Sequence, residues 1–416
     1  MSSYRVLMST LGRSHFISAA DALVRNGCDL DLLQGWTPRN LDSWTVRLAT
    51  KIVGRKTLVA GFAKRTTPAL ENHIISEPLG EVVHTVLQLL VGRNEYLKNL
   101  SISTGFKLHG FLSRRHLKGH QIFHVKSGLG QGGAIAKAKK MGLQVIVDQG
   151  IAHPSFMRDI LKAEYEKNNL PHENIDGSFW NVVMKDCKEA DVLQVNSDFV
   201  KDTFVEHGFP ADRIRVVYLG VRQDFNSLCE YNYPNRREHI NILFTGAFRM
   251  RKGAEYLLAT MLRLRDIGVR FQLNIVGSCD SFGRKLQEIA VREKLPIIFH
   301  GHIAQDDLIR HFKDNDIYLF PSLSEGCAQS GMEAMSAGLC VVATRESGLP
   351  IDHNENGIIV KVKDVDSIVQ NIVRLINDPN EVARLGRNAA IKLKAYTWDR
   401  YAQNVLNLYH ELLGGK

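Results

Sequence analysis

The feature that most constrains the fold is the regular alternation of short apolar runs with helix-like segments along the 416-residue chain. Runs of this kind occupy 5–10, 30–35, 121–125, 143–148, 191–196 and 214–219, and then 240–246, 271–277, 297–301, 317–322, 339–344 and 357–362. Short apolar strands separated by helices are typical of parallel sheets that carry helices on their faces. The sequence therefore predicts an α/β chain with two parallel, Rossmann-like sheets.

The polar stretch 222–239 contains a proline and no apolar run, so it is the best candidate for a linker. A chain of this length is also too long for a single ordinary core. We expect an N-terminal domain over 1–222, a second domain over 223–396, and a C-terminal helix within 397–416 that can pack back on the first domain. Ligands of such sheets bind at the carboxyl ends of the strands, so the loops at those ends are the candidate sites.

The composition indicates a globular protein, because 44% of the residues are hydrophobic and 23% are charged. No apolar run approaches the ~20 residues of a membrane-spanning helix, and the first residues do not resemble a signal peptide. The six cysteines lack paired spacing, so neither a disulfide framework nor a zinc site is indicated. We expect a protein of the reducing cytoplasm.

The net charge of +9 favours anionic partners. Residues 44–65 and 107–120 contain no acidic residue and place Lys and Arg among apolar side chains. Such segments bind anionic membrane surfaces, but they also form solvated faces over an ordinary core. Contact with the inner face of a membrane is thus one of two interpretations, and we expect no nucleic-acid partner.

A basic turn follows the run 240–246, where Arg249, Arg251 and Lys252 stand between a strand end and a helix start. Cations beside free backbone N–H groups form a site for phosphate oxygens. Taken alone, such a turn is more commonly a solvent-exposed basic loop.

Residues 322–338 read SLSEGCAQSGMEAMSAG, a stretch of small residues that leads into a helix predicted to begin near Gln329. The N–H groups of 327–330 would face the cleft and attract a phosphate. Glu325 and Glu333 would repel phosphate, and hydroxyl groups are therefore their expected partners. A sugar and a ribose joined through a diphosphate would satisfy both carboxylates, whereas an isolated glutamate is more often a capping or surface residue.

Taken together, these stretches resemble the retaining family 4 glycosyltransferases, which have the GT-B fold. The resemblance is carried by FTGAFRMRKGAEYLLAT, by the segment from IIFHGHIAQDD to SAGLCVVAT, and by EADVLQVNSDFVKDTFVEHGFPADRIRVVYLGV. It covers nearly the whole chain. It implies a nucleotide-diphosphate sugar as donor, a hydroxyl group as acceptor, retention of the anomeric configuration, and neither a metal nor another cofactor.

The resemblance also implies roles for residues of the second half. Lys252 and an arginine would bind the diphosphate; Arg249 is preferred, but Arg251 stays open because the family's arginine often follows the glycine directly, where this chain has Ala247. Glu325 would bind the transferred sugar and Glu333 the ribose. Further donor contacts are implied for Gly277, His302, Ile303, Gly326, Cys327 and Ala328.

In the first half, the resemblance places Gly12 near the donor phosphate and His153 near the reacting sugar. His153 would supply an orienting hydrogen bond more than base chemistry. The implied catalytic set is therefore Glu325, His153 and Lys252.

An NAD(P)-dependent oxidoreductase is a competing interpretation. Gly128, Gly130 and Gly133 form a G-x-G-x-x-G pattern after a predicted strand, and Asp148 ends the next strand, as in the dinucleotide-binding fingerprint. Such fingerprints often lie nearer the start of their domain, and this interpretation leaves the second-half motifs without a role. A sugar-nucleotide epimerase on the same architecture and a non-catalytic binding protein with a decayed site also stay open.

Overall fold

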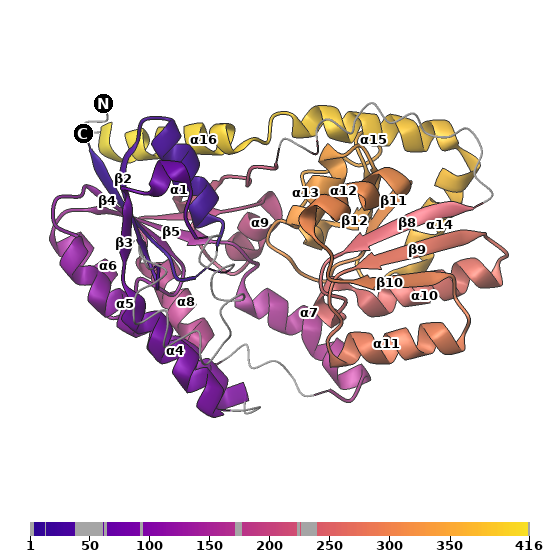
Figure 1. The fold of residues 1–416 in the computed structure, drawn as a ribbon, viewed down its shortest axis with the longest axis horizontal. Helices are drawn as coiled ribbons and strands as arrows, with labels where there is room; N and C mark the ends of the chain where they lie inside the picture. The colour runs from indigo at the N-terminus through magenta and orange to yellow at the C-terminus, as the bar shows by residue number, and fades with distance from the viewer. Residues whose placement is uncertain are drawn as a thin grey trace.

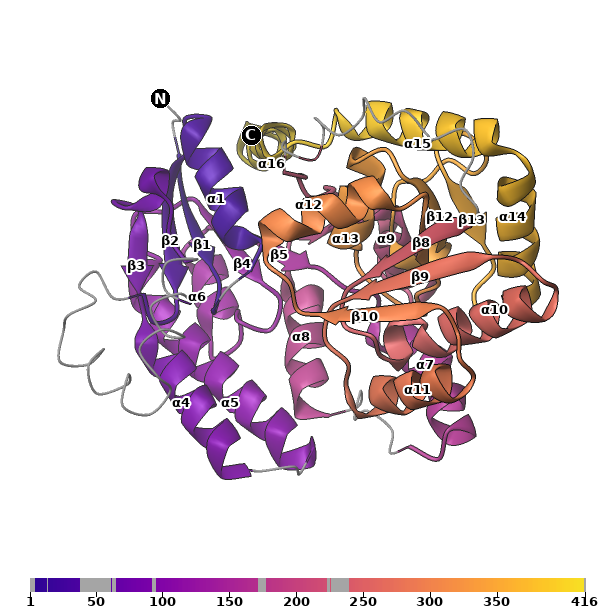
Figure 2. The ribbon, with the colours of Figure 1, turned by 45° about the vertical axis from the view of Figure 1, so that its right-hand side comes forward.

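The computed structural model describes residues 4–12, 14–37, 61, 65–91, 95–170, 177–222, 225 and 239–414. Two parallel sheets lie side by side, and each is covered by helices (Figures 1 and 2). Most of the basic stretch 44–65 lies outside the described residues. No helix of the described part is both long and apolar enough to cross a bilayer.

The first sheet is wholly parallel and has the strand order β3-β2-β1-β4-β5-β6-β7. All six apolar runs of the first half form strands, and one further strand, β3, was not predicted because polar residues flank its two isoleucines and no longer apolar run marks it. The strands are β1 (Arg5–Ser9), β2 (Asp29–Gln34), β3 (Ile74–Ser76), β4 (Ile122–Lys126), β5 (Gln144–Gln149), β6 (Val192–Val195) and β7 (Ile214–Val216).

The helices of the first domain include a hairpin that the sequence did not predict, formed by α4 (Pro78–Val91) and α5 (Glu95–Ser113). It lies at the lower left of Figure 1. The other helices are α1 (Phe16–Arg25), α6 (Ala134–Lys140), α7 (Pro154–Lys167), α8 (Ser178–Glu189) and α9 (Asp198–Glu206).

The second sheet is also parallel and has the order β10-β9-β8-β11-β12-β13. Its strands coincide with the six predicted runs: β8 (Ile240–Thr245), β9 (Phe271–Val276), β10 (Ile297–Gly301), β11 (Ile317–Phe320), β12 (Cys340–Thr344) and β13 (Ile358–Val360). Its helices are α10 (Ala254–Asp266), α11 (Ser281–Arg292), α12 (Gln305–Asp314), α13 (Gln329–Ser336), α14 (Val365–Asn377) and α15 (Pro379–Leu393).

The last helix, α16 (Trp398–Gly414), leaves the second domain and packs on the first (Figure 1). The Tyr409 hydroxyl lies 2.8 Å from Nδ1 of His124 on β4. Gln194 on β6 donates to the Tyr401 hydroxyl at 3.0 Å. Together with the apolar packing of α16 on β1, β2 and α1, these buried contacts let α16 close one face of the first sheet and tie the two domains together.

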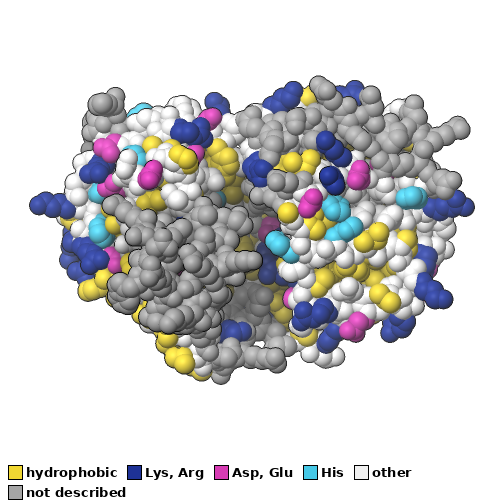
Figure 3. All heavy atoms as spheres, in the orientation of Figure 1, with side chains coloured by type: hydrophobic (Ala, Val, Ile, Leu, Met, Phe, Trp, Pro, Cys, Tyr) yellow, Lys and Arg dark blue, Asp and Glu magenta, His cyan; other side chains and the backbone are white. Residues whose placement is uncertain are grey.

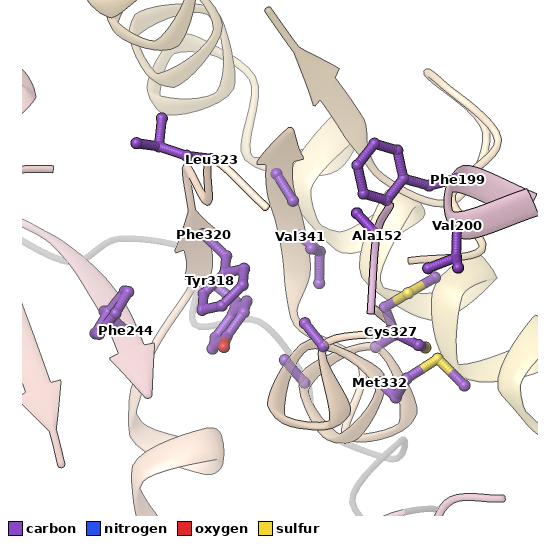
Figure 4. Packing of buried hydrophobic residues seen from close by; sticks show 14 of the residues in the cluster. Ala152, Phe199, Val200, Phe244, Tyr318, Phe320, Leu323, Cys327, Met332 and Val341 are labelled. Carbon is purple, nitrogen blue, oxygen red and sulfur yellow. The ribbon is translucent and has the colours of Figure 1, made fainter. Parts of the chain in front are cut away.

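The hydrophobic core continues across the boundary between the domains. Ala152 and Val200 of the first domain lie beside Cys327 of the second (Figure 4). At the same boundary the Ser197 hydroxyl donates to the Gly326 carbonyl oxygen at 2.6 Å. A Cβ on Gly326 would lie 1.9 Å from the Gly150 carbonyl oxygen, so only glycine allows this approach.

Candidate active site

Three glycines stand at the carboxyl ends of neighbouring strands of the second sheet: Gly246 after β8, Gly277 after β9 and Gly301 at the end of β10. Their φ angles are +126°, +141° and +66°, a backbone region that favours glycine. The Gly277 N–H donates to the Gly301 carbonyl oxygen at 2.8 Å, and a Cβ on Gly277 would lie 2.0 Å from the Gly246 carbonyl oxygen. Gly277 is therefore required by the close packing of the strand ends, and the three glycines form a glycine edge without side chains.

The basic turn (246–253) places its cations beside this edge. Arg251 Nη1 lies 3.0 Å and Lys252 Nζ 3.3 Å from the same carboxylate oxygen, Oε1 of Glu325. Lys252 Nζ also lies 5.0 Å from the centroid of the Phe320 ring. Burial lowers the pKa of Lys252, and the nearby Arg251 and Arg249 act in the same direction against the effect of Glu325. A bound anion would relieve this crowding of positive charge.

The two candidate arginines differ in how far their side chains are already bonded. Arg251 pairs with Glu325, and its guanidinium also donates to the Ser324 carbonyl oxygen. Arg249 has a buried Nε with no hydrogen-bond partner among the described residues. A buried donor without a partner costs free energy, so a ligand oxygen at Arg249 would be stabilising. Arg249 therefore has more hydrogen-bonding capacity left than Arg251, and which of the two binds a diphosphate stays a prediction.

Glu325 and Glu333 differ in their surroundings. The Glu325 side chain is 13% exposed, and two cations are its partners rather than the hydroxyl groups predicted for it. Its N–H donates to the Glu346 carbonyl oxygen at 2.8 Å, which fixes the loop. Glu333 is partly exposed on α13, which begins at Gln329 as predicted. The sugar and ribose contacts of the two glutamates stay predictions.

The start of α13 is less open than predicted. The Ala328 N–H donates to the Ser347 carbonyl oxygen at 3.0 Å, so it is not free for a ligand, and the role predicted for it is corrected here. Burial raises the pKa of the adjacent Cys327 thiol to about 12, so this cysteine stays protonated. His302 is exposed and Ile303 partly exposed just beyond the glycine edge.

A buried hydroxyl cluster under α13 was not predicted. The Tyr318 hydroxyl on β11 lies 2.8 Å from Ser330 Oγ and 3.2 Å from Thr245 Oγ1, directly before Gly246. Burial raises the pKa of Tyr318, and the charges of Glu333 and Glu325 act in the same direction. The cluster joins the ends of β8 and α13, and the single tyrosine within the apolar run 317–320 was the available signal.

Gly12 follows β1 with a φ of +63° at the carboxyl edge of the first sheet. A Cβ there would lie 3.8 Å from Oε1 of Glu81, the first acidic residue of α4. Arg65 binds Glu81 through both carboxylate oxygens, at 2.6 and 2.7 Å. This pair was not predicted, because Arg65 and Glu81 carry no local motif. The predicted contact of Gly12 with the donor phosphate would place that phosphate near a carboxylate neutralised by Arg65.

His153 precedes α7, where its Nδ1 accepts a hydrogen bond from the Ser155 N–H at 3.2 Å. Its ring stacks on His207 with centroids 4.3 Å apart and is 7% exposed as a residue. Burial lowers its pKa to about 4, with further lowering by His207, Lys188 and Arg158. These described ring contacts all lie within the first domain, so its contact with the reacting sugar stays a prediction.

The glycine loop (127–133), which carries the G-x-G-x-x-G pattern, is filled from within the protein. The Gly130 N–H donates to one carboxylate oxygen of Asp186 at 2.8 Å, and Gln131 Nε2 donates to the other at 2.7 Å. A Cβ on Gly132 would lie 2.0 Å from the Lys107 carbonyl oxygen of α5. The carboxylate stands where a dinucleotide phosphate would bind, and the glycines serve close packing. The loop thus gives the oxidoreductase interpretation no support.

Comparison with known proteins identifies similarity to glycosyltransferases in the second domain. Residues 239–378 match the family model described as Glycosyl transferases group 1. An uncharacterized glycosyltransferase of Methanocaldococcus jannaschii is 29% identical over 237 residues, which is 53% of this chain and 60% of that protein. The match to this relative therefore spans less than two thirds of its length.

Solved structures show the fold. Sucrose-phosphate synthase from Thermosynechococcus elongatus aligns with a TM-score of 0.66 at 17% identity and covers 99% of this chain and 100% of its own. The Anabaena protein HepE, in complex with UDP and glucose, aligns with a TM-score of 0.61 at 14% identity over 98% and 100% of the two chains. The fold is GT-B, as predicted. The family match, by contrast, is limited to residues 239–378 and shows that this part of the chain is similar to group 1 glycosyl transferases.

Proposed function

We propose that the protein transfers a sugar from a nucleotide-diphosphate donor to an acceptor hydroxyl, in the manner of the retaining family 4 enzymes. The observation that carries this proposal is the basic turn beside the glycine edge, with Arg249, Arg251 and Lys252 at one point. We propose that the donor binds beside this turn, on the side that faces the first domain. The HepE structure holds UDP and glucose on the same fold.

The charges of the site suit the departure of a diphosphate. The bond between the sugar C1 and the diphosphate oxygen breaks, the acceptor oxygen bonds to C1, and the acceptor proton passes to the departing diphosphate oxygen. Attack from the side of the leaving group retains the anomeric configuration. Lys252 and Arg249 would stabilise the negative charge as it develops, an effect worth several kcal/mol. We propose that these cations take the place of a metal ion.

Within the proposed reaction, Glu325 has a second task. Its carboxylate holds Arg251 and Lys252 together while no donor is bound. When a diphosphate takes over the cations, the carboxylate is released toward the hydroxyl groups of the sugar. Glu333, one helical turn into α13, would bind the ribose.

The proposal is tested by calorimetric titration with nucleoside diphosphates, followed by the corresponding nucleotide sugars and a panel of hydroxyl acceptors. We expect one nucleoside diphosphate to bind, transfer to an acceptor with retention, and no loss of rate in the presence of EDTA. Epimerised donor formed without acceptor would favour the epimerase interpretation. An absence of donor binding, hydrolysis and transfer across the panel would overturn the proposal.

We also propose that the protein acts at the cytoplasmic face of a membrane, through the first domain. Four apolar residues repeat along one face of α4 and are 39–77% exposed: Leu79, Val82, Val86 and Leu90. Yellow side chains mark this lower left edge in Figure 3. Lys118 and Arg115 of the stretch 107–120 are also exposed. An apolar stripe near basic residues suits an anionic lipid surface.

Liposome co-sedimentation tests this attachment. We expect binding to anionic vesicles that weakens with salt and falls when Val86 and Leu90 are both changed to Ser. Val291→Ser, on α11 of the second domain, is the matched control because that side chain is also exposed. Equal sedimentation of all variants, or none at low salt, would contradict the proposed attachment.

A further inference from the structure

A second cavity lies wholly within the first domain, apart from the basic turn. It has a volume of about 410 Å³ and is bounded by the start of α7, by one face of α8 and by the segment after α9. Cavities of this size suit small ligands. Its lining residues are His153, Pro154, Ser155, Trp180, Asn181, Met184, Lys188, His207 and Phe209.

Two stacked imidazoles form one wall of this side pocket, with ring planes 13° apart. Nδ1 of His153 accepts the Ser155 N–H, so the neutral ring carries its proton on Nε2. Nδ1 of His207 lies 2.7 Å from the Thr203 carbonyl oxygen and must donate to it, which leaves the Nε2 of a neutral His207 as an acceptor. The wall thus has one donor nitrogen and one acceptor nitrogen left over for a hydroxylated ligand.

The electrostatics of the side pocket are positive. Lys188 lines it, and Lys188 and Arg158 both act to lower the pKa of His153. No Asp or Glu occurs among the described residues that line it. A ligand with a negative charge would therefore be attracted.

The other walls of the side pocket include two aromatic rings and the amide group of an asparagine. Trp180 and Phe209 are partly buried and partly exposed, so each ring offers surface to a flat apolar face. Asn181 adds a carbonyl oxygen and an amide group that suit hydroxyls. Apolar ring surfaces combined with a few fixed polar groups are typical of small-molecule sites. A sugar ring has both an apolar face of C–H groups and a rim of hydroxyls.

We propose that the side pocket is a binding site for a sugar ring that carries an anionic group, either a carboxylate or a phosphate. The ring lies against Trp180 and Phe209, its hydroxyls meet Asn181 and the two histidines, and Lys188 pairs with the anion. The side pocket shares no lining residue with the basic turn, and the proposal does not depend on the proposed transferase activity.

Calorimetric titration with glucose 6-phosphate, glucuronate, glucose and inorganic phosphate tests the proposal. We expect glucose 6-phosphate or glucuronate to bind more tightly than glucose and inorganic phosphate. Comparison of these two charged sugars shows whether the site prefers a phosphate or a carboxylate. Lys188→Ala should weaken binding about tenfold, as expected when a charge-assisted contact is lost. Lys185→Ala is the matched control, since Lys185 lies on the same helix, pairs with Glu189 and does not line the pocket.

Lys252→Ala separates the two sites. Binding in the side pocket should survive this substitution, and it should be lost in Trp180→Ala or, if that variant does not fold, weakened in Asn181→Ala. Absence of binding by either charged sugar at millimolar concentration would overturn the proposal. Binding that disappears in Lys252→Ala and persists in Lys188→Ala would place the ligand at the basic turn and would also overturn it.

Discussion

Two glycine-rich turns of this protein look alike in sequence and differ in what they can bind. The glycine loop (127–133) of the first domain and the basic turn (246–253) of the second both lead from a parallel strand into a helix. In the first, the backbone N–H of Gly130 is taken by the Asp186 carboxylate. In the second, Arg249, Arg251 and Lys252 gather at the strand end. The comparison shows that the same kind of glycine pattern can be occupied by a carboxylate of the protein in one turn and surrounded by cations in the other, so only the second is suited to phosphate.

In both turns a glycine packs tightly against a backbone carbonyl oxygen. The two turns therefore differ mainly in the charge of the side chains around them. A Cβ on Gly132 would lie 2.0 Å from the Lys107 carbonyl oxygen, and a Cβ on Gly253 would lie 1.9 Å from the Pro321 carbonyl oxygen. Both glycines have positive φ, +83° and +75°. Glycine is therefore required by packing in each turn and does not by itself indicate a ligand.

The substitution Lys252→Ala, in the basic turn, should have the largest effect on ligand binding. We expect nucleoside diphosphate affinity to fall about 100-fold, because a mostly buried charged partner of the phosphate is lost. Titration calorimetry measures the change. Lys285→Ala, an exposed lysine on α11, is the control and should bind as the wild type does. Unchanged affinity in Lys252→Ala would remove the basic turn from the site.

Paired glycine substitutions sharpen the comparison at the level of packing. Gly132→Ala and Gly253→Ala should each lower the free energy of unfolding by about 2 kcal/mol, because each added methyl overlaps a backbone carbonyl. Only Gly253→Ala should also weaken nucleotide binding, since it displaces the neighbouring cations. Denaturant unfolding and calorimetry measure the two effects. Loss of nucleotide affinity in folded Gly132→Ala would show that the glycine loop takes part in binding after all.

Most of the fold was predictable from the sequence, because buried parallel strands leave continuous apolar runs. All twelve predicted runs are strands in the structure, whereas β3 has only two isoleucines between polar residues and so lacks an apolar run. The α4–α5 hairpin was missed because the apolar residues of α4 include an exposed stripe, so that helix lacks the usual contrast between faces.

The site was predictable only in part, because its ion pairs and hydrogen bonds join residues that are far apart in the sequence. The sequence places Glu325 and Lys252 in separate motifs and cannot show that they lie 3.3 Å apart. The hydrogen bond between the Ala328 N–H and Ser347 joins two loops with no shared pattern. Asp186, which fills the glycine loop, lies more than fifty residues from Gly130 along the chain.

The two arginines of the basic turn provide a smaller test. Arg249→Ala should weaken nucleoside diphosphate binding about tenfold and leave stability nearly unchanged, since its Nε has no hydrogen-bond partner among the described residues. Arg251→Ala should instead lower the melting temperature, because Arg251 pairs with Glu325 and donates to Ser324. Calorimetry and thermal unfolding on both variants measure the split. The reverse pattern would make Arg251 the diphosphate arginine.

The carboxylate that fills the glycine loop gives the smallest and most local test. Burial raises the pKa of Asp186 to about 7, against the lowering effect of its hydrogen bonds from Gln131 and Gly130. The folded state then binds more protons than the unfolded state between about pH 4 and pH 7, so stability falls as the pH rises through this window. We expect a loss of about 1 kcal/mol between pH 6 and pH 7 from this group.

Asp186→Asn removes that titration, because an amide carries no charge at any of these pH values. Denaturant unfolding at pH 6 and pH 7 should therefore show a smaller loss in Asp186→Asn than in the wild type. Asp159→Asn, an exposed carboxylate on α7, should keep the wild-type difference. Equal losses in wild type and Asp186→Asn would mean that the carboxylate is ionised throughout this range. The glycine loop would then surround a permanently charged carboxylate, as an anion-binding loop does. Its backbone would in that case resemble the basic turn in its capacity to stabilise negative charge.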